Sequence, residues 1–286
     1  MQPPQRPLRQ QPAPPMRPQN QAAAPLRQLE IDRFWSDQME KPRYADPRSL
    51  LRHGFKVYSQ ADEDGIIQEI FKRIGETNRT FIEFGVESGI ECSTVKLLVE
   101  GWNGLWIEMA ADHVQAIRHT FSEFIAEDRL WLCQSKVTTD NINALIADAG
   151  IGGEIDLLSI DIDGNDYWVW QAIEQVRPRV TVVEYNATLR PPMSLTVPYD
   201  PDRVWDTSNF FGASLEALTR LGRKKGYRLV GCSFSGVNAF FVREDLCGDK
   251  FLEPATAEMH YEPPRYYFQP SAGHRPGPGR YVSIEE

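Results

Sequence analysis

The sequence predicts an α/β domain in which helices cover both faces of a mostly parallel sheet. Between residues 56 and 245, short apolar runs alternate with segments that have the apolar spacing of amphipathic helices. The runs are nearly continuous, as expected for strands buried on both faces. The predicted strands are 80–84, 104–109, 130–134, 155–162, 180–185, 227–233 and 237–242, and the predicted helices are 65–74, 92–100, 114–123, 141–149, 167–175 and 214–225.

The last two predicted strands differ from the others because only residues 234–236 separate them. So short a connection predicts a hairpin, in which one strand must run antiparallel. A parallel sheet that ends in an antiparallel hairpin strand is a Rossmann-like variant. In such a sheet, ligands bind at the carboxyl ends of the strands, near the point where the strand order reverses.

The composition divides the chain into four parts. Residues 1–28 hold eight prolines and seven glutamines, which predicts a disordered tail. Residues 29–55 lead into the predicted domain, which covers residues 56–245. Residues 246–286 are rich in proline and aromatic side chains and are expected to extend over the surface of the domain.

The overall composition excludes several classes of protein. A net charge of -9 argues against a general nucleic-acid-binding protein, and no stretch is apolar enough to span a membrane. No signal peptide is visible, and the four cysteines form no C-x-x-C pair, so we expect reduced thiols and a cytoplasmic location. Zinc is not expected.

A glycine turn follows the first predicted strand, in the stretch FIEFGVESG that contains Glu83, Gly85, Glu87 and Gly89. Glu108 ends the second predicted strand, nineteen residues beyond Gly89. An acid at about this spacing accepts hydrogen bonds from the hydroxyls of a ribose. These residues predict a site for a nucleoside-containing cofactor.

Glu87 distinguishes between two such cofactors. It stands where a dinucleotide-binding loop has a glycine, and its carboxylate would repel the two phosphates of NAD. S-adenosylmethionine has a ribose and an adenine but no phosphate, and it carries a positive sulfonium and ammonium. The acidic turn therefore favours S-adenosylmethionine.

Acidic residues also follow the fourth predicted strand, in the stretch LSIDIDGND. If the strand continues, Asp161 and Asp163 point to the same side and repel each other. One solution is a divalent cation such as Mg²⁺, held by Asp161, Glu184 and Asn186. The alternative is that Asp161 contacts the cofactor or loop amides while Asp163 caps the next helix.

The segments FIEFGVESG, GLWIE, DLLSIDIDGNDYWVW, VVEYN and GVNAFFVR resemble those of class I S-adenosylmethionine-dependent methyltransferases, and most nearly the FkbM-like group. The resemblance covers about residues 56–245 and departs from the common loop pattern at Glu87. It implies a doubly wound seven-stranded sheet in the order 3-2-1-4-5-7-6 with the last strand antiparallel. It also implies methylation of a hydroxyl on a sugar or small metabolite.

The resemblance also assigns roles to individual residues. Glu83, Gly85 and Gly89 would line the methionine and ribose side of the cofactor, and Glu108 would hold the ribose. Ser135 is the candidate for the adenine, and Gln60 for the amino-acid end. An acceptor hydroxyl needs a base, for which Asp163 is the first choice and Asp161 the second. The histidines at 113 and 119 fall on a helix expected to lie far from the site.

The long connection at residues 187–212 is rich in proline and aromatic residues, which predicts an ordered lid over the acceptor, either a small molecule or a glycan. Two other functions stay open. One is a methyltransferase-like binding module that has lost catalysis. The other is an NAD-dependent oxidoreductase, which Glu87 opposes.

Overall fold

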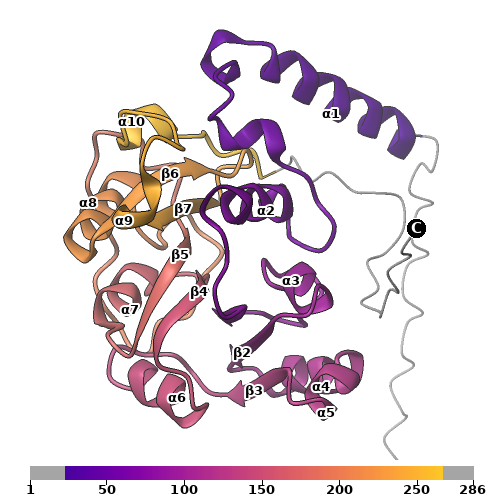
Figure 1. Cartoon of the computed structure of the whole chain (residues 1–286), viewed down its shortest axis with the longest axis vertical. Coiled ribbons are helices and arrows are strands. Elements are labelled where there is room, and N and C mark those ends of the chain that lie inside the picture. Colours follow the sequence, from indigo (N-terminus) through magenta and orange to yellow (C-terminus); the bar gives the residue numbers. More distant parts are fainter. Residues whose placement is uncertain (1–22, 267–286) are drawn as a thin grey trace, which may run out of the picture.

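The computed structural model describes residues 23–266 and confirms the predicted α/β fold with its seven-stranded sheet (Figure 1). The strand order is β3-β2-β1-β4-β5-β7-β6. Strands β1 to β5 pair in parallel, whereas β7 runs antiparallel to both β5 and β6, as the short hairpin predicts. The strands are β1 (Thr80–Phe84), β2 (Asn103–Glu108), β3 (Leu130–Gln134), β4 (Gly153–Ile160), β5 (Val176–Glu184), β6 (Tyr227–Cys232) and β7 (Asn238–Arg243).

The helices cover both faces of the sheet. They are α1 (Ala23–Met39), α2 (Glu63–Ile74), α3 (Val95–Val99), α4 (Ala111–Thr120), α5 (Ser122–Ala126), α6 (Ile142–Asp148), α7 (Asp166–Ala172), α8 (Leu215–Lys225), α9 (Glu244–Cys247) and α10 (Ala257–His260), with 3₁₀ turns η1 (Pro42–Tyr44) and η2 (Leu50–His53). One core cluster contains residues of α2, α3, α4 and α5, and the other contains residues of α6, α7 and α8. Because side chains alternate along a strand, Phe81 belongs to the first cluster and Ile82 to the second.

Two predicted helices differ from the structure. The helix predicted at 92–100 begins only at Val95, because the backbone N–H groups of Ser93 and Thr94 are hydrogen-bonded to the Glu83 side chain instead of continuing a helix. The helix predicted at 114–123 is two helices, α4 and α5, which meet at the buried Phe121.

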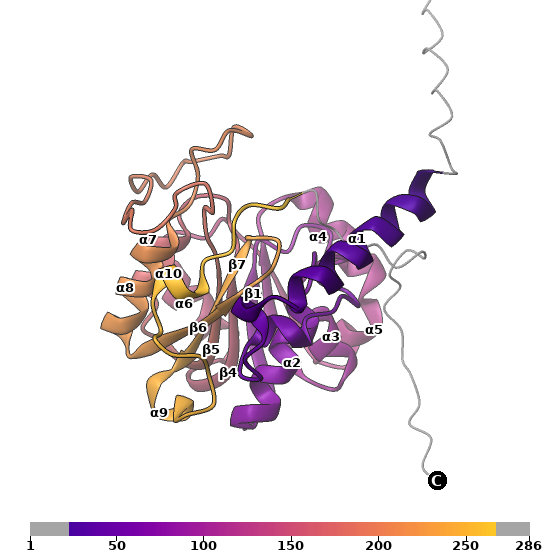
Figure 2. The ribbon, with the colours of Figure 1, turned by 90° about the horizontal axis from the view of Figure 1, so that it is seen from above.

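The chain termini also differ from the predicted segments. Helix α1 begins at Ala23, inside the segment predicted as a disordered tail. Its Trp35 and Met39 pack against the core of the domain, and its N-terminal part extends away from the domain (Figure 2). The boundary at residue 245 falls inside α9, and the segment beyond it contains α10, whose His260 is buried. Predictions for residues 1–22 and 267–286 lie outside the described residues.

The cysteines and the apolarity of the helices can be described for residues 23–266. All four cysteines have free thiols. No helix in this part of the chain has both the length and the apolarity needed to cross a bilayer.

Glu262 joins the N-terminal and C-terminal segments of the described chain. It is buried, and its carboxylate accepts hydrogen bonds from Arg43, Tyr44 and Arg265. Its backbone carbonyl accepts a hydrogen bond from the Tyr185 hydroxyl at 2.7 Å, directly after β5. The C-terminal segment is therefore fixed to both η1 and the end of a central strand.

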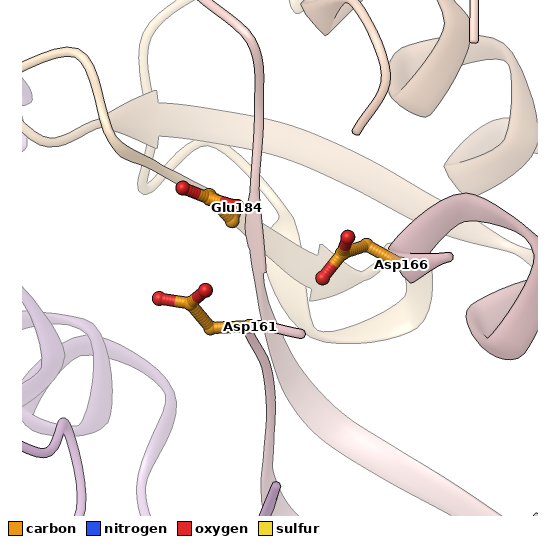
Figure 3. A group of neighbouring side chains, drawn as sticks. All are labelled: Asp161, Asp166 and Glu184. Atoms are coloured by element: carbon orange, nitrogen blue, oxygen red, sulfur yellow. The ribbon is translucent and has the colours of Figure 1, made fainter. Parts of the chain in front are cut away.

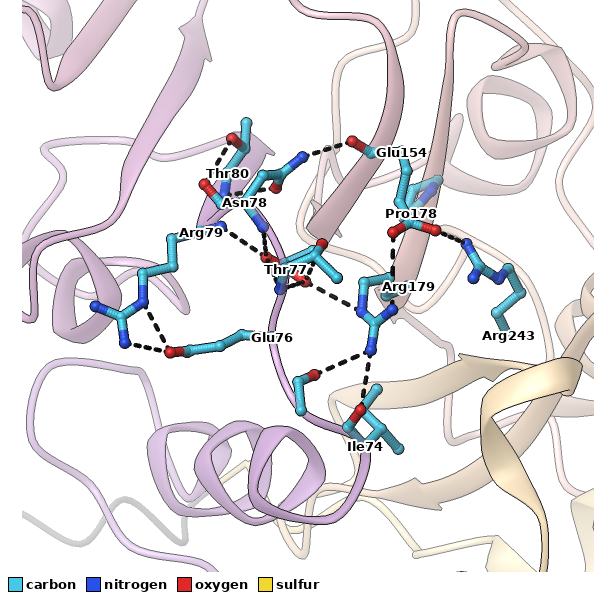
Figure 4. A network of polar contacts seen from close by, with 12 residues as sticks. Ile74, Glu76, Thr77, Asn78, Arg79, Thr80, Glu154, Pro178, Arg179 and Arg243 are labelled. Carbon is cyan, nitrogen blue, oxygen red and sulfur yellow. Dashed lines mark hydrogen bonds and ion pairs between the residues drawn. The ribbon is translucent and has the colours of Figure 1, made fainter.

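Asp156 organises the amino edge of the sheet, opposite to the edge where ligands bind in this fold. Figure 4 shows the network around it, with its partners Thr77, Arg79 and Arg179 labelled. Its fully buried carboxylate accepts hydrogen bonds from the backbone N–H groups of Thr77, Asn78 and Arg79 at 2.7–3.0 Å. Arg179 of β5 completes the set with an ion pair at 3.2 Å. The Asp156 carboxylate is therefore compensated by backbone N–H groups and by Arg179. It joins the segment before β1 to β4 and β5.

We expect Asp156→Asn to lower the free energy of unfolding by about 3 kcal/mol, because it leaves Arg179 buried without its partner and replaces acceptor oxygens by a donor. Denaturant unfolding measures this. The matched control is Glu216→Gln, which removes an exposed pair with Arg220 worth about 0.3–0.5 kcal/mol. Equal stabilities for the two variants would contradict the role assigned to Asp156.

Candidate active site at the carboxyl edge of the sheet

The predicted site residues gather where β1, β2, β4 and β5 end. Parallel pairing places Phe84 beside both Ile107 and Ile160, so the turns that follow β1, β2 and β4 share one edge. The antiparallel β7 begins at this same edge, since Asn238 pairs with Glu184. The structure therefore brings together side chains that lie more than a hundred residues apart.

Glu83 lies beneath this edge, and its carboxylate is hydrogen-bonded within the protein, whereas the prediction placed it beside the cofactor. Its buried carboxylate accepts hydrogen bonds from Ser93 N, Thr94 N, Thr94 Oγ1 and Ser159 Oγ. Burial raises the pKa of Glu83, and these four donors oppose that effect. Glu83 is a positioning residue that joins the end of β1 to the start of α3 and to β4.

The two predicted glycines have different roles. Gly85 has φ +79°, and a Cβ there would lie 1.5 Å from the Asp161 carbonyl oxygen, so the β1 turn can touch the β4 turn only without a side chain. Gly89 is buried, and a Cβ there would meet Phe121 and Trp106 at 2.9 Å. Gly85 thus shapes the site, whereas Gly89 allows the turn to pack on the core.

Glu87 and Glu108 meet, as the prediction of a shared site requires. Glu87 has φ +47°, a left-handed conformation for which glycine is favoured, and its side chain is exposed. Its backbone N–H donates to Glu108 Oε2 at 2.9 Å, while Ala110 N donates to Glu108 Oε1 at 2.8 Å. Each carboxylate oxygen keeps a second lone pair for a ligand hydroxyl.

Ser135 and Gln60 are connected to this edge by different contacts. Ser135 follows β3, and its N–H donates to the Glu108 carbonyl oxygen. Gln60 is exposed on a loop tied to the β1 turn by Lys56, whose Nζ contacts both the Gln60 carbonyl oxygen and Glu91. Asp64 holds the same loop, since its Oδ2 accepts from three consecutive N–H groups, those of residues 57–59.

Three carboxylates converge where β4 and β5 end (Figure 3). Asp161, Asp166 and Glu184 offer oxygen atoms that all lie within 4.8 Å of one another. The prediction placed Asp163 beside Asp161 in a continuing strand, and this is wrong. Strand β4 ends at Ile160, and Asp163 is exposed with φ +55°.

The turn between β4 and α7 explains why Asp166 replaces Asp163. The Asp166 side chain accepts hydrogen bonds from Ile162 N and Gly164 N at 2.8 and 2.9 Å, which folds the turn back over it. Asp166 is fully buried beside Asp161. In the sequence, Asp166 was visible only as the third acid of the stretch LSIDIDGND.

Asn186 has no capacity left for a cation, in contrast to its predicted role. Its Nδ2 donates to the carbonyl oxygens of Asn209 and Phe211, both at 2.9 Å, and its Oδ1 accepts from Thr188 N and Thr188 Oγ1. The amide therefore fastens both ends of the connection at 187–212. Trp205 and Phe210 on this connection are exposed.

Burial and mutual repulsion act together on the acids. The pKa of Glu184 is raised well above its usual value by burial, then by Asp161, Asp166 and Asp163. Burial, and then Asp166 and Asp163, likewise raise the pKa of Asp161, and burial raises that of Asp166 to about 6. The exposed Asp163 also has a raised pKa, from desolvation and from Glu87.

Two other residues at this edge were not predicted. His113 Nδ1 lies 3.7 Å from Glu108 Oε1, although its helix was expected to lie far from the site. Glu63 reaches the same edge through Asn238, whose Nδ2 donates to Glu63 Oε1 at 3.1 Å. Neither contact has a signal in the local sequence, because each joins separate elements.

The strand order is the one that the sequence resemblance implied. No family model and no curated protein match the sequence.

Several solved structures of methyltransferases are similar. An O-methyltransferase from Bacillus cereus in complex with SAH is 14% identical, with a TM-score of 0.43 over 75% of this chain and 88% of that chain. A putative O-methyltransferase from Klebsiella pneumoniae is 14% identical, with a TM-score of 0.42 over 74% and 94%. The glycopeptide N-methyltransferase MtfA complexed with S-adenosyl-L-methionine is 14% identical, with a TM-score of 0.38 over 64% and 94%. At these levels the comparisons assign neither an acceptor nor the FkbM-like group.

Glu87→Gly and Glu87→Ala form a matched pair that tests the conformation of the β1 turn. Both remove the carboxylate and keep the N–H that donates to Glu108. We expect the glycine variant to be more stable by about 1 kcal/mol, because only glycine adopts a positive φ without steric cost. Denaturant unfolding measures the difference. An alanine variant of equal or greater stability would show that the turn is not strained.

Glu184→Gln tests the repulsion within the carboxylate group. The native pKa is raised above the usual 4.5, so the native state holds a proton that the unfolded state loses. Stability must therefore fall as the pH rises above about 4.5. In the presence of a chelator at pH 7, we expect the variant to be more stable by about 2 kcal/mol and to lack that part of the decline. Thermal unfolding between pH 4 and 8 measures this, and a less stable variant at pH 7 would contradict it.

Proposed function

We propose that this protein is an S-adenosylmethionine-dependent methyltransferase. The observation that carries the proposal is the contact between Glu87 N and Glu108 Oε2. It sets a buried ribose-binding acid directly beside an acidic turn. A pyrophosphate has no place in such a turn, whereas a nucleoside with positive groups does.

The strand order sets the direction of the cofactor. Glu108 ends β2 for the ribose, and Ser135 follows the neighbouring β3, so the adenine extends toward β3. The methionine end then extends toward β4 and Asp161, across the opening that Gly85 leaves. Gln60, on the loop that Lys56 ties to this turn, contacts the amino-acid end. The positive groups of the cofactor would meet negative side chains along this path.

We propose a hydroxyl on a sugar or small metabolite as the acceptor. S-adenosylmethionine supplies an activated methyl group, so the chain itself must align the acceptor and take up its proton. Asp163 is the proposed base, since it is exposed at the edge of the site and its raised pKa strengthens it as a proton acceptor. Asp161 is the second choice. A divalent cation beside Asp161 and Glu184 would instead lower the pKa of the acceptor hydroxyl.

The connection at 187–212 covers the acceptor side of the site. Its Arg203 side chain lies against Gly164, since a Cβ on this glycine would be 2.6 Å from Arg203 Cδ. Asn165 Nδ2 also donates to the Asp200 carbonyl oxygen, at 2.8 Å. The lid is thus fixed directly to the turn that carries Asp163.

Calorimetry with S-adenosylmethionine, S-adenosylhomocysteine and NAD tests the cofactor, and transfer of a tritiated methyl group to candidate acceptors tests catalysis. We expect both sulfur-containing nucleosides to bind and NAD not to bind. Binding without transfer to any hydroxyl acceptor would support a binding module that has lost catalysis. Binding of NAD alone would overturn the proposal.

Glu108→Ala should weaken S-adenosylmethionine binding by about 2 kcal/mol, because charge-assisted hydrogen bonds to the ribose are lost. Calorimetry measures the affinity. Glu100→Gln is the control, since Glu100 is exposed and pairs with Lys96 in the same part of the chain. Thermal unfolding must show that the alanine variant is folded. Unchanged affinity would remove Glu108 from the cofactor site.

A further inference from the structure

We propose that Asp161, Asp166 and Glu184 form a binding site for one divalent cation, Mg²⁺, Mn²⁺ or Ca²⁺. Asp161 follows β4, Asp166 begins α7 and Glu184 ends β5, so three separate elements each contribute one carboxylate. This set differs from the one that the sequence predicted, because Asp166 takes the place of Asn186.

The spacing of the oxygen atoms suits a cation. The oxygen atoms offered by the three side chains all lie within 4.8 Å of one another, and Figure 3 shows the carboxylates turned toward a common space. Oxygen ligands on opposite sides of one Mg²⁺ or Ca²⁺ ion are about 4–5 Å apart. Small side-chain rotations therefore suffice for all three carboxylates to contact one ion.

Glu184 provides a second observation. Its Oε2 atom is buried and has no hydrogen-bond partner within residues 23–266. Asn238, which faces Glu184 across the β5–β7 pair, donates to Glu63 instead. A buried carboxylate oxygen without a donor is costly, and a bound cation would remove that cost.

Several other buried acids are compensated by the protein itself, although Asp62 Oδ1 and Asp64 Oδ1 also lack a hydrogen-bond partner within the described residues. Glu83 has four donors, Asp156 has backbone N–H groups and Arg179, and Glu262 has Arg265. In contrast, no ion pair of the described residues includes Asp161, Asp166 or Glu184. The negative charge of this group is therefore either reduced by bound protons or balanced by a cation from outside the described chain.

Asp166 has the support expected of a ligand. The N–H groups of Ile162 and Gly164 each bind one of its oxygens and fix the direction of the carboxylate, and each oxygen keeps a second lone pair. All three ligands are carboxylates, without histidine or cysteine, which selects hard cations over zinc or copper.

The test is Mn²⁺ binding by the full chain, followed by electron paramagnetic resonance and by calorimetry, with no methyl acceptor present. We expect one Mn²⁺ ion per chain, displaced by Mg²⁺ or Ca²⁺. Glu184→Gln and Asp161→Asn should each weaken binding at least tenfold, because each removes a ligand. Glu100→Gln, on the surface, should bind as the wild type does. Thermal unfolding in chelator shows that each variant is folded.

Two outcomes would overturn the site: no stoichiometric Mn²⁺ binding by the wild type, or wild-type affinity in both ligand variants. Neither outcome bears on the proposed methyl transfer, because cofactor binding is measured separately in chelator. If S-adenosylmethionine binds and the cation does not, only this inference fails. If Mn²⁺ binds and S-adenosylmethionine does not, only the proposed function fails.

Discussion

The hydrogen bonds of the Glu83 carboxylate hold the candidate site together. They tie the end of β1 to Ser93 and Thr94 before α3 and to Ser159 in β4. The turn between these anchor points carries Gly85 and Glu87. With its two ends fixed, the turn has to pass close to β4, and only a glycine allows the approach to the Asp161 carbonyl oxygen. A buried acid thus determines the position of the turn that carries Gly85 and Glu87.

The two edges of the sheet handle buried charge in opposite ways. At the amino edge, Asp156 receives backbone N–H groups and an arginine, and it stabilises the entry to β1. At the carboxyl edge, Glu184 keeps an oxygen without a donor beside Asp161 and Asp166. Proteins generally tolerate such uncompensated groups where a ligand completes them. The contrast supports the carboxyl edge as the functional one.

Much of the fold could be predicted from the sequence because it depends on local patterns. Apolar runs and a three-residue hairpin turn are properties of short segments, and the strand order followed from the resemblance. The meeting of Glu87 with Glu108 was also predictable, since parallel strands end at one edge. It depends on strand position and not on side-chain detail.

The remaining site residues depend on contacts that no short segment reveals. Asp163 and Asp166 differ only in how the turn after β4 folds, and that turn is set by the hydrogen bonds that Asp166 accepts. Asn186 was assigned to a cation because its type fits, but the lid occupies its amide. Residue type was informative about the class of chemistry, whereas the partners of each side chain decided its role.

The Glu262 contacts join the N-terminal and C-terminal parts of the described chain. Arg43 and Tyr44 near its start and Arg265 near its end meet at one buried carboxylate, and Tyr185 holds the adjoining carbonyl. Local unfolding that reaches Arg43 and Tyr44 from one side, or Arg265 from the other, breaks contacts that hold both segments. These contacts lie next to the end of β5, because Tyr185, which follows Glu184, donates to the Glu262 carbonyl oxygen. Loss of Arg43 and Tyr44 on one side, or of Arg265 on the other, would therefore weaken the packing of the opposite segment and of the end of β5 together.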